Sequence, residues 1–143
     1  MTIAVGQPAP AFTLSDHIGT QHALSDYAGQ WVLLYFYPKD DTPGCTTEAC
    51  SLRDNLPKFS AVNAVVLGVS TDSVKSHAKF VQKYGLPFTL LADEDKIVVN
   101  AYGVQGMMGT KRTSFLIDPA GKVARIYENV KPAEHVAQVL ADL

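Results

Sequence analysis

Apolar residues along the chain are grouped into short runs that are separated by polar, turn-forming segments. The first long run, residues 31–37, is apolar throughout and rich in aromatic and β-branched side chains. This composition is typical of a strand that is buried on both faces, as in a sheet covered by helices. Residues 64–70 and 88–92 repeat the pattern. The pattern therefore predicts three buried strands, the first of which ends at Pro38.

Between these strands, apolar residues recur every three or four positions, which is the spacing of an amphipathic helix. This spacing predicts helices over residues 45–61, 74–84 and 132–143, and the acidic residues 93–95 suit the start of a short helix that runs through residue 102. Pro57 lies inside the first helix, and we expect a kink or break there because proline lacks the amide hydrogen. Ser73 and Gly85 are suited to begin and end the second helix.

A hairpin is predicted towards the end of the chain. Residues 113–117 and 123–127 have strand composition, and residues 118–121 between them, Asp-Pro-Ala-Gly, fit a type I turn. Residues 103–110 contain three glycines, and we expect a loop there. Alternating strands and helices favour an α/β fold with a central mixed β-sheet flanked by helices. The length of 143 residues favours one domain over residues 1–143.

Composition and charge exclude several classes of protein. With 47% hydrophobic residues, the chain is too apolar for an intrinsically disordered protein. Its net charge is −2 without a block of basic residues, which argues against a nucleic-acid or membrane-surface partner. Neither a signal peptide nor an apolar run of about 20 residues is visible. Two cysteines are too few for a secreted disulfide scaffold, so we expect a soluble, cytoplasmic protein.

The sequence has no pattern typical of a metal or cofactor site. Its histidines are scattered without the spacing of metal ligands, and we expect each to be solvated at the surface: His17, His22, His77 and His135. The glycines of residues 103–109 do not have the spacing of a dinucleotide-binding loop. We therefore expect neither a metal nor a cofactor.

The two cysteines lie at the first junction between strand and helix. Cys45 follows Thr-Pro-Gly at the expected helix N-terminus, where unpaired amide hydrogens and the helix dipole favour a thiolate over a thiol. The thiolate is the nucleophilic form of cysteine, so this position indicates a redox or nucleophilic centre. The alternative is that Cys45 is a small buried apolar residue, as free cysteines often are.

Cys50 lies five residues after Cys45 on the same predicted helix. In an ideal helix, such a pair has a Cα separation of roughly 8.5 Å, and the two side chains point in different directions. A disulfide needs a Cα separation of about 4.4–6.8 Å. If the two cysteines pair, the first turns of the helix must therefore unwind.

The segment around the cysteines, YFYPKDDTPGCTTEAC, resembles the active-site segment of the peroxiredoxins. It is most similar to the branch called bacterioferritin comigratory protein or peroxiredoxin Q. The family motif of Pro, three residues, Thr, two residues and Cys matches at Pro38, Thr42 and Cys45. Cys50 matches the second cysteine of many members of this branch. The resemblance implies a thioredoxin-like fold and a thiol-dependent peroxidase.

The resemblance also implies a role for each matched residue. Cys45 would attack hydrogen peroxide or an organic hydroperoxide and become a sulfenic acid. Cys50 would form an intramolecular disulfide with it, which thioredoxin or a similar dithiol protein would reduce. Arg112 matches the active-site arginine of the family, which would hold the thiolate and polarise the leaving oxygen. Thr42 would hydrogen-bond the peroxide, and Pro38 would shield the thiolate from water.

Each of these residues also has a simpler interpretation. Arg112 would be a surface arginine, Thr42 a turn former bonded to its own backbone, and Pro38 a strand terminator. Cys50 would be a small buried residue in a one-cysteine enzyme. Glu48, in the first turns of the predicted helix, would hold Arg112 or a water molecule, or would only add favourable charge there.

Three other functions compete with peroxide reduction. A thioredoxin-type disulfide oxidoreductase typically uses Cys-x-x-Cys, whereas four residues separate the cysteines of this chain. A non-enzymatic redox or metal-binding module would need metal-ligand spacing, which is absent from the sequence. Some peroxiredoxins act as chaperones in large assemblies, but nothing in this sequence demands such a role. Members of the branch are often monomers, so the resemblance favours a monomer.

Overall fold

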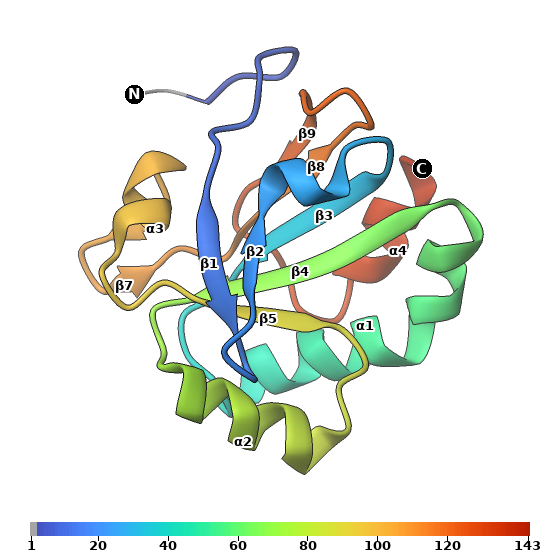
Figure 1. The fold of residues 1–143 in the computed structure, drawn as a ribbon. Coiled ribbons are helices and arrows are strands. Elements are labelled where there is room, and N and C mark those ends of the chain that lie inside the picture. Colours follow the sequence, from blue (N-terminus) through green and yellow to red (C-terminus); the bar gives the residue numbers. More distant parts are fainter. Residues whose placement is uncertain (1–2) are drawn as a thin grey trace.

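A computed structural model describes residues 3–143, which are built on a seven-stranded mixed β-sheet (Figure 1). In their order across the sheet, the strands are β2 (Gln21–Ala23), β1 (Thr13–Asp16), β5 (Thr89–Ala92), β4 (Ala64–Ser70), β3 (Trp31–Phe36), β8 (Thr113–Ile117) and β9 (Val123–Tyr127). The remaining elements are a 3-10 turn (Leu24–Tyr27), a hairpin of β6 (Gln105–Gly106) and β7 (Gly109–Thr110), and helices α1 (Pro43–Ala61), α2 (Val74–Tyr84), α3 (Ile97–Ala101) and α4 (His135–Ala141). Within residues 3–143, none of the helices has the length and apolar run that a membrane span requires.

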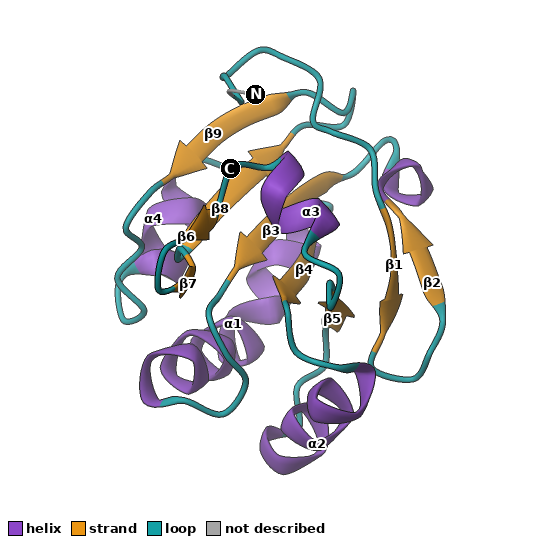
Figure 2. Cartoon of the chain, turned by 90° about the vertical axis from the view of Figure 1, so that its left-hand side faces the viewer, coloured by secondary structure: helices purple, strands orange, loops and turns teal. Residues whose placement is uncertain are grey.

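The strand register brings three segments of the chain to one edge of the sheet. β3 pairs in parallel with β4, with Phe36 opposite Val69, and its arrowhead points to the same side as that of β4 (Figure 2). β3 pairs antiparallel with β8, with Phe36 opposite Thr113. The ends of β3 and β4 and the start of β8 therefore lie together. The loops after β3 and β4 and the residue before β8 meet at this edge.

Alternating side chains of β3 contribute to a hydrophobic core on each face of the sheet. Leu33 and Tyr35 belong to a cluster that also includes buried residues of α1, α2 and α4. Val32, Leu34 and Phe36 belong to a second cluster, with buried residues of α3 and of the segment before β1. Because a strand side chain points to alternate faces, this arrangement places helices on both sides of the sheet, as predicted.

The strands predicted within residues 31–37, 64–70 and 88–92 and the predicted hairpin are confirmed as β3, β4, β5, β8 and β9. The first helix differs from its prediction, because α1 begins at Pro43 and runs through Pro57 without a break. A proline removes one main-chain hydrogen bond, and the many other bonds of a 19-residue helix tolerate that loss.

The other helices agree with prediction best where a cap is present. α2 has the predicted limits, because the Ser73 side chain accepts the amide of Ser76 and Gly85 ends the helix with φ of 58°. α3 is shorter than predicted, since Lys96 adopts a left-handed conformation with φ of 62° just before it. α4 begins only at His135, after a turn over residues 131–135.

Four short strands are not predicted by the sequence pattern. β1 and β2 have four and three residues, carry several polar side chains and form one side of the sheet beyond β5. β6 and β7 have two residues each and lie within the predicted loop over residues 103–110. Strands of this length are too short for an alternation of period two to be recognised.

The prediction that every histidine lies at the surface is wrong. His77 and His135 are fully buried, and the His22 side chain is 19% exposed. His22 is bonded to Asp16 at 2.7 Å and to Tyr27 at 2.6 Å. A buried imidazole is stable where its ring nitrogens find hydrogen-bond partners, and all three of these rings have at least one.

Candidate active site

The predicted nucleophile lies at the start of α1, at the sheet edge described above. Thr42 is the N-cap of α1, Pro43 is its first residue and Cys45 its third. Cys45 is a free thiol and only 2% exposed. The Thr42 side chain does not cap the helix, so the first amide hydrogens of α1 remain available near the sulfur. Cys50 is a second free thiol, half-buried on the same continuous helix.

Arg112 connects this cysteine with a buried carboxylate. Its Nη2 donates to Cys45 Sγ at 3.3 Å, and its Nη1 donates to Glu48 Oε1 at 2.9 Å. Its main-chain carbonyl accepts the amide of Val130 at 3.0 Å, which fixes the residue just before β8. The structure thus brings together three residues that were singled out in the sequence, and Arg112 is not a free surface arginine.

Glu48 is fully buried beneath this arginine. Burial raises the pKa of Glu48 to about 7, although the positive charge of Arg112 and its hydrogen bond act in the opposite direction. Its second oxygen, Oε2, has no hydrogen-bond partner within residues 3–143. The carboxylate therefore titrates near neutral pH, and its charge state alters the electrostatic environment of Cys45 through Arg112.

His135 lies behind Glu48 and was not predicted as part of the site. Its Nε2 is 2.9 Å from Ser114 Oγ and 3.9 Å from Glu48 Oε2. Burial and, after it, the positive charge of Arg112 lower the pKa of His135 to about 4, so the ring is neutral at pH 7. No local pattern in the sequence placed this histidine near Glu48, and its position at the surface was the expectation.

The Thr42 hydroxyl donates to the Lys39 carbonyl at 2.8 Å. This hydrogen bond is the one expected if Thr42 is a turn former bonded to the local backbone. Thr42 is also the N-cap residue of α1, the helix that carries Cys45. Pro38 is exposed at the end of β3, and its shielding of the thiolate stays a prediction.

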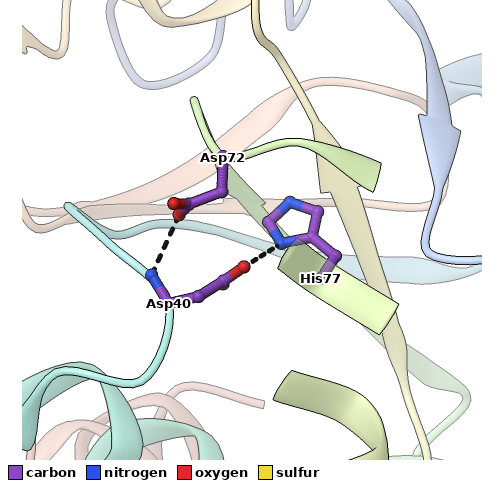
Figure 3. A group of neighbouring side chains, drawn as sticks. All are labelled: Asp40, Asp72 and His77. Carbon is purple, nitrogen blue, oxygen red and sulfur yellow. Dashed lines mark hydrogen bonds and ion pairs between the residues drawn. The ribbon is translucent and has the colours of Figure 1, made fainter. Parts of the chain in front are cut away.

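A buried polar cluster lies beside the site, between the loop after β3 and α2 (Figure 3). Asp40 is bonded through Oδ2 to His77 Nδ1 at 2.7 Å, and its main-chain amide donates to Asp72 Oδ2 at 2.9 Å. His77 Nε2 lies 2.9 Å from the carbonyl oxygen of Leu91. Because a carbonyl only accepts, Nε2 carries a hydrogen, and a further proton lies between Nδ1 and the Asp40 carboxylate.

The ligand atoms offered by Asp40, Asp72 and His77 lie within 4.8 Å of one another, as in some metal sites. These atoms are already used in hydrogen bonds, and Nε2 of His77 carries a hydrogen towards a carbonyl. The cluster therefore acts as a set of hydrogen bonds that holds the loop. The segment that resembles the peroxiredoxin active site contains Asp40, but no local pattern indicates that Asp40 contacts Asp72.

Comparisons with known proteins agree over nearly the full chain. Residues 5–126 match the AhpC/TSA family. Peroxiredoxin Bcp of Bacillus subtilis is 44% identical, with 100% of this chain and 96% of the relative covered. The solved structure of a PrxQ mutant from Xylella fastidiosa is similar with a TM-score of 0.94 and 39% identity, covering 99% of this chain and 96% of the other.

The bacterioferritin comigratory protein of Xanthomonas campestris, for which alkyl peroxide reduction activity is described, is similar with a TM-score of 0.91. It is 40% identical, with 97% of this chain and 96% of the other covered. The fold is therefore thioredoxin-like, as the sequence resemblance implied. The match to the family also spans the whole sheet edge that carries Cys45 and Arg112. The chain belongs to the AhpC/TSA family and is a thiol peroxidase of the peroxiredoxin Bcp and PrxQ group.

Proposed function

We propose that this peroxiredoxin reduces hydrogen peroxide and organic hydroperoxides at Cys45. The observation that carries the proposal is the 3.3 Å contact between the Arg112 guanidinium and the Cys45 sulfur at the N-terminus of α1. A permanent positive charge and the helix N-terminus both stabilise a thiolate. The alkyl peroxide reduction described for the Xanthomonas campestris relative supports organic hydroperoxides as one class of substrate.

In the first step, the Cys45 thiolate attacks one peroxide oxygen and the O–O bond breaks. The other oxygen takes up a proton and leaves as water or an alcohol. The sulfur is oxidised by two electrons to a sulfenic acid, and the peroxide is reduced by the same two electrons. Arg112 stabilises negative charge first on the sulfur and then on the leaving oxygen, while Glu48 keeps the guanidinium in place.

Thr42 and Pro38 complete the proposed peroxide site. The Thr42 hydroxyl directs its hydrogen to Lys39, so its oxygen is available to accept a hydrogen bond from the peroxide O–H. Pro38 has no amide hydrogen, and beside the loop it would limit access of water without offering a competing donor.

Cys50 resolves the sulfenic acid in the second step. Its thiol attacks the Cys45 sulfur, a disulfide forms and the oxygen leaves as water. A dithiol protein, which we take to be thioredoxin, then reduces this disulfide by thiol–disulfide exchange and is itself oxidised. Both cysteines lie on one unbroken helix, so the second step requires the start of α1 to unwind.

Single-turnover peroxide reduction tests the proposal directly. The reduced wild type, Cys45→Ser and Cys50→Ser are mixed with hydrogen peroxide, and the sulfenic acid and disulfide are detected by mass. Cys45→Ser should not react, whereas Cys50→Ser should complete one round and stop at the sulfenic acid. Thioredoxin-driven turnover that is unchanged in Cys50→Ser would remove Cys50 from the mechanism.

We also propose that the protein works as a single-domain monomer in the cytoplasm. Two free cysteines that must be reduced in every cycle suit a reducing compartment. Sedimentation of the reduced and oxidised protein measures the oligomeric state, and a stable dimer in both states would contradict this part of the proposal.

A further inference from the structure

One peptide group in the loop before α1, between Lys39 and Asp40, is held on both sides. Its carbonyl oxygen accepts the Thr42 hydroxyl at 2.8 Å, and its amide donates to Asp72 Oδ2 at 2.9 Å. The same Asp72 oxygen accepts the hydroxyl of Ser70 at 2.6 Å. A peptide group is planar, so a partner that fixes the N–H also fixes the direction of the C=O. The direction of the Thr42 hydroxyl therefore depends on Asp72.

The side chain of Asp40 prevents this peptide group from rotating. Its Oδ1 accepts the hydroxyl of Tyr37 at 2.6 Å. Its Oδ2 accepts the hydroxyl of Ser76 at 2.8 Å. The same oxygen shares a proton with His77 Nδ1 at 2.7 Å (Figure 3). Asp40 is 8% exposed, and His77 is fully buried. Hydrogen bonds that involve charged groups in such surroundings are strong, so the loop is fixed to α2.

We propose that Asp72 and Asp40 are positioning residues for the peroxide reaction, which act by orienting the hydroxyl of Thr42. This inference rests on the proposed function, in which Thr42 accepts a hydrogen bond from the peroxide. The carbonyl of the held peptide group accepts a hydrogen bond from the Thr42 hydroxyl. A lone pair of the Thr42 oxygen is therefore left to accept a hydrogen bond from the substrate. The contact of Arg112 with Cys45 does not involve Asp72. The loss of Asp72 should therefore weaken the hydrogen bond between Thr42 and the peroxide and leave the Cys45 sulfur unaffected.

Two reagents separate orientation of Thr42 from reactivity of the thiol. The rate of loss of the Cys45 thiol is measured by quenching and mass detection, with hydrogen peroxide and with iodoacetamide, which needs no hydrogen bond from Thr42. Asp72→Ala should react with peroxide about tenfold more slowly, and with iodoacetamide at the wild-type rate. Asp72→Asn should restore most of the peroxide rate, because its amide oxygen can still accept the Asp40 amide.

Asp41→Ala is the matched control, since this neighbouring carboxylate binds Lys83 and Tyr84 of α2 at the surface and does not hold the peptide group. It should react with peroxide at close to the wild-type rate. An equal loss in Asp41→Ala and Asp72→Ala would overturn the inference, because loosening of the loop would then explain both. Asp72→Glu, which keeps the charge but displaces the acceptor, replaces Asp72→Ala if that variant does not fold.

A double-mutant cycle gives the decisive result. In a Thr42→Val background, Asp72→Ala should have no further effect on the peroxide rate, because the group it orients is already missing. A further tenfold loss in that background would overturn the inference. If wild-type Cys45 itself does not react with peroxide, the proposed function fails instead, and the iodoacetamide rates show that the thiol was available.

Discussion

Arg112 donates to the sulfur of Cys45 at 3.3 Å from a position 67 residues further along the chain. The same guanidinium holds Glu48 at 2.9 Å through its other terminal nitrogen. The two terminal nitrogens of the planar guanidinium each reach one of these partners, whereas a lysine offers a single nitrogen on a flexible stem. The electrostatics of Cys45, the proposed nucleophile, therefore depend on the shape of the arginine as well as on its charge.

Arg112→Lys keeps the charge but loses this fork, and should lower kcat/KM for hydrogen peroxide by about 10²–10³-fold. The measurement is steady-state peroxide reduction with a dithiol reductant. Arg125→Lys serves as the control, because Arg125 is exposed and forms only a long ion pair of 3.9 Å with Asp142. If Arg112→Lys stays within a few-fold of the wild type, positive charge alone is sufficient at this position.

Gly44→Ala tests the same contact from the side of α1. A Cβ at this position would lie 3.0 Å from Arg112 Nη2, the nitrogen that reaches Cys45. Alanine favours the helix by up to about 1 kcal/mol over glycine, so the melting temperature should not fall. The peroxide rate should nevertheless fall about tenfold, because the guanidinium must move away from the sulfur.

Thr47→Ala is the control for a substitution by alanine on the same helix. The Thr47 side chain is exposed and donates a hydrogen bond to the Pro43 carbonyl. Thr47→Ala should leave the peroxide rate unchanged. A Gly44→Ala protein with both rate and stability at the wild-type level would mean that Arg112 adjusts without losing its hold on Cys45.

Local patterns were sufficient to predict most of the fold, whereas Arg112 was singled out beside Cys45 only through the family resemblance. The long apolar run of β3 and the caps of α2 each depend on neighbouring residues, so the sequence alone shows them. The burial of His135 and the contact between Asp40 and Asp72 depend on which strands lie side by side. No local pattern carries that information. For this reason the two buried histidines, His77 and His135, were wrongly expected at the surface.

Oxidation should unwind the beginning of α1. The disulfide between Cys45 and Cys50 cannot form across an intact helix, where the Cα separation is roughly 8.5 Å. Amide hydrogen exchange within residues 43–50 should therefore become faster after one equivalent of peroxide, while exchange in β3 stays slow. Cys50→Ser treated in the same way should keep the protection of its helix, and equal protection in oxidised and reduced wild type would contradict the prediction.

The buried carboxylate of Glu48 makes stability depend on pH in an unusual direction. Its pKa is about 7 in the folded protein, against 4.5 for an ordinary glutamate. Between these two values the folded state holds a proton that the unfolded state has released, so stability falls as the pH rises. The whole change corresponds to a loss on the order of 3 kcal/mol, complete above about pH 7.

Glu48→Gln removes this titration, so the variant should not show the loss of stability that the ionisation of Glu48 causes as the pH rises. Urea unfolding of both proteins at pH 4.5, 6 and 8 gives the difference in unfolding free energy, wild type minus variant. This difference should decrease steadily as the pH rises. His135, whose pKa of about 4 makes stability fall towards acid pH, is present in both proteins, so its effect cancels from the difference. A difference that is constant from pH 4.5 to 8 would show that Glu48 stays ionised beneath Arg112 throughout.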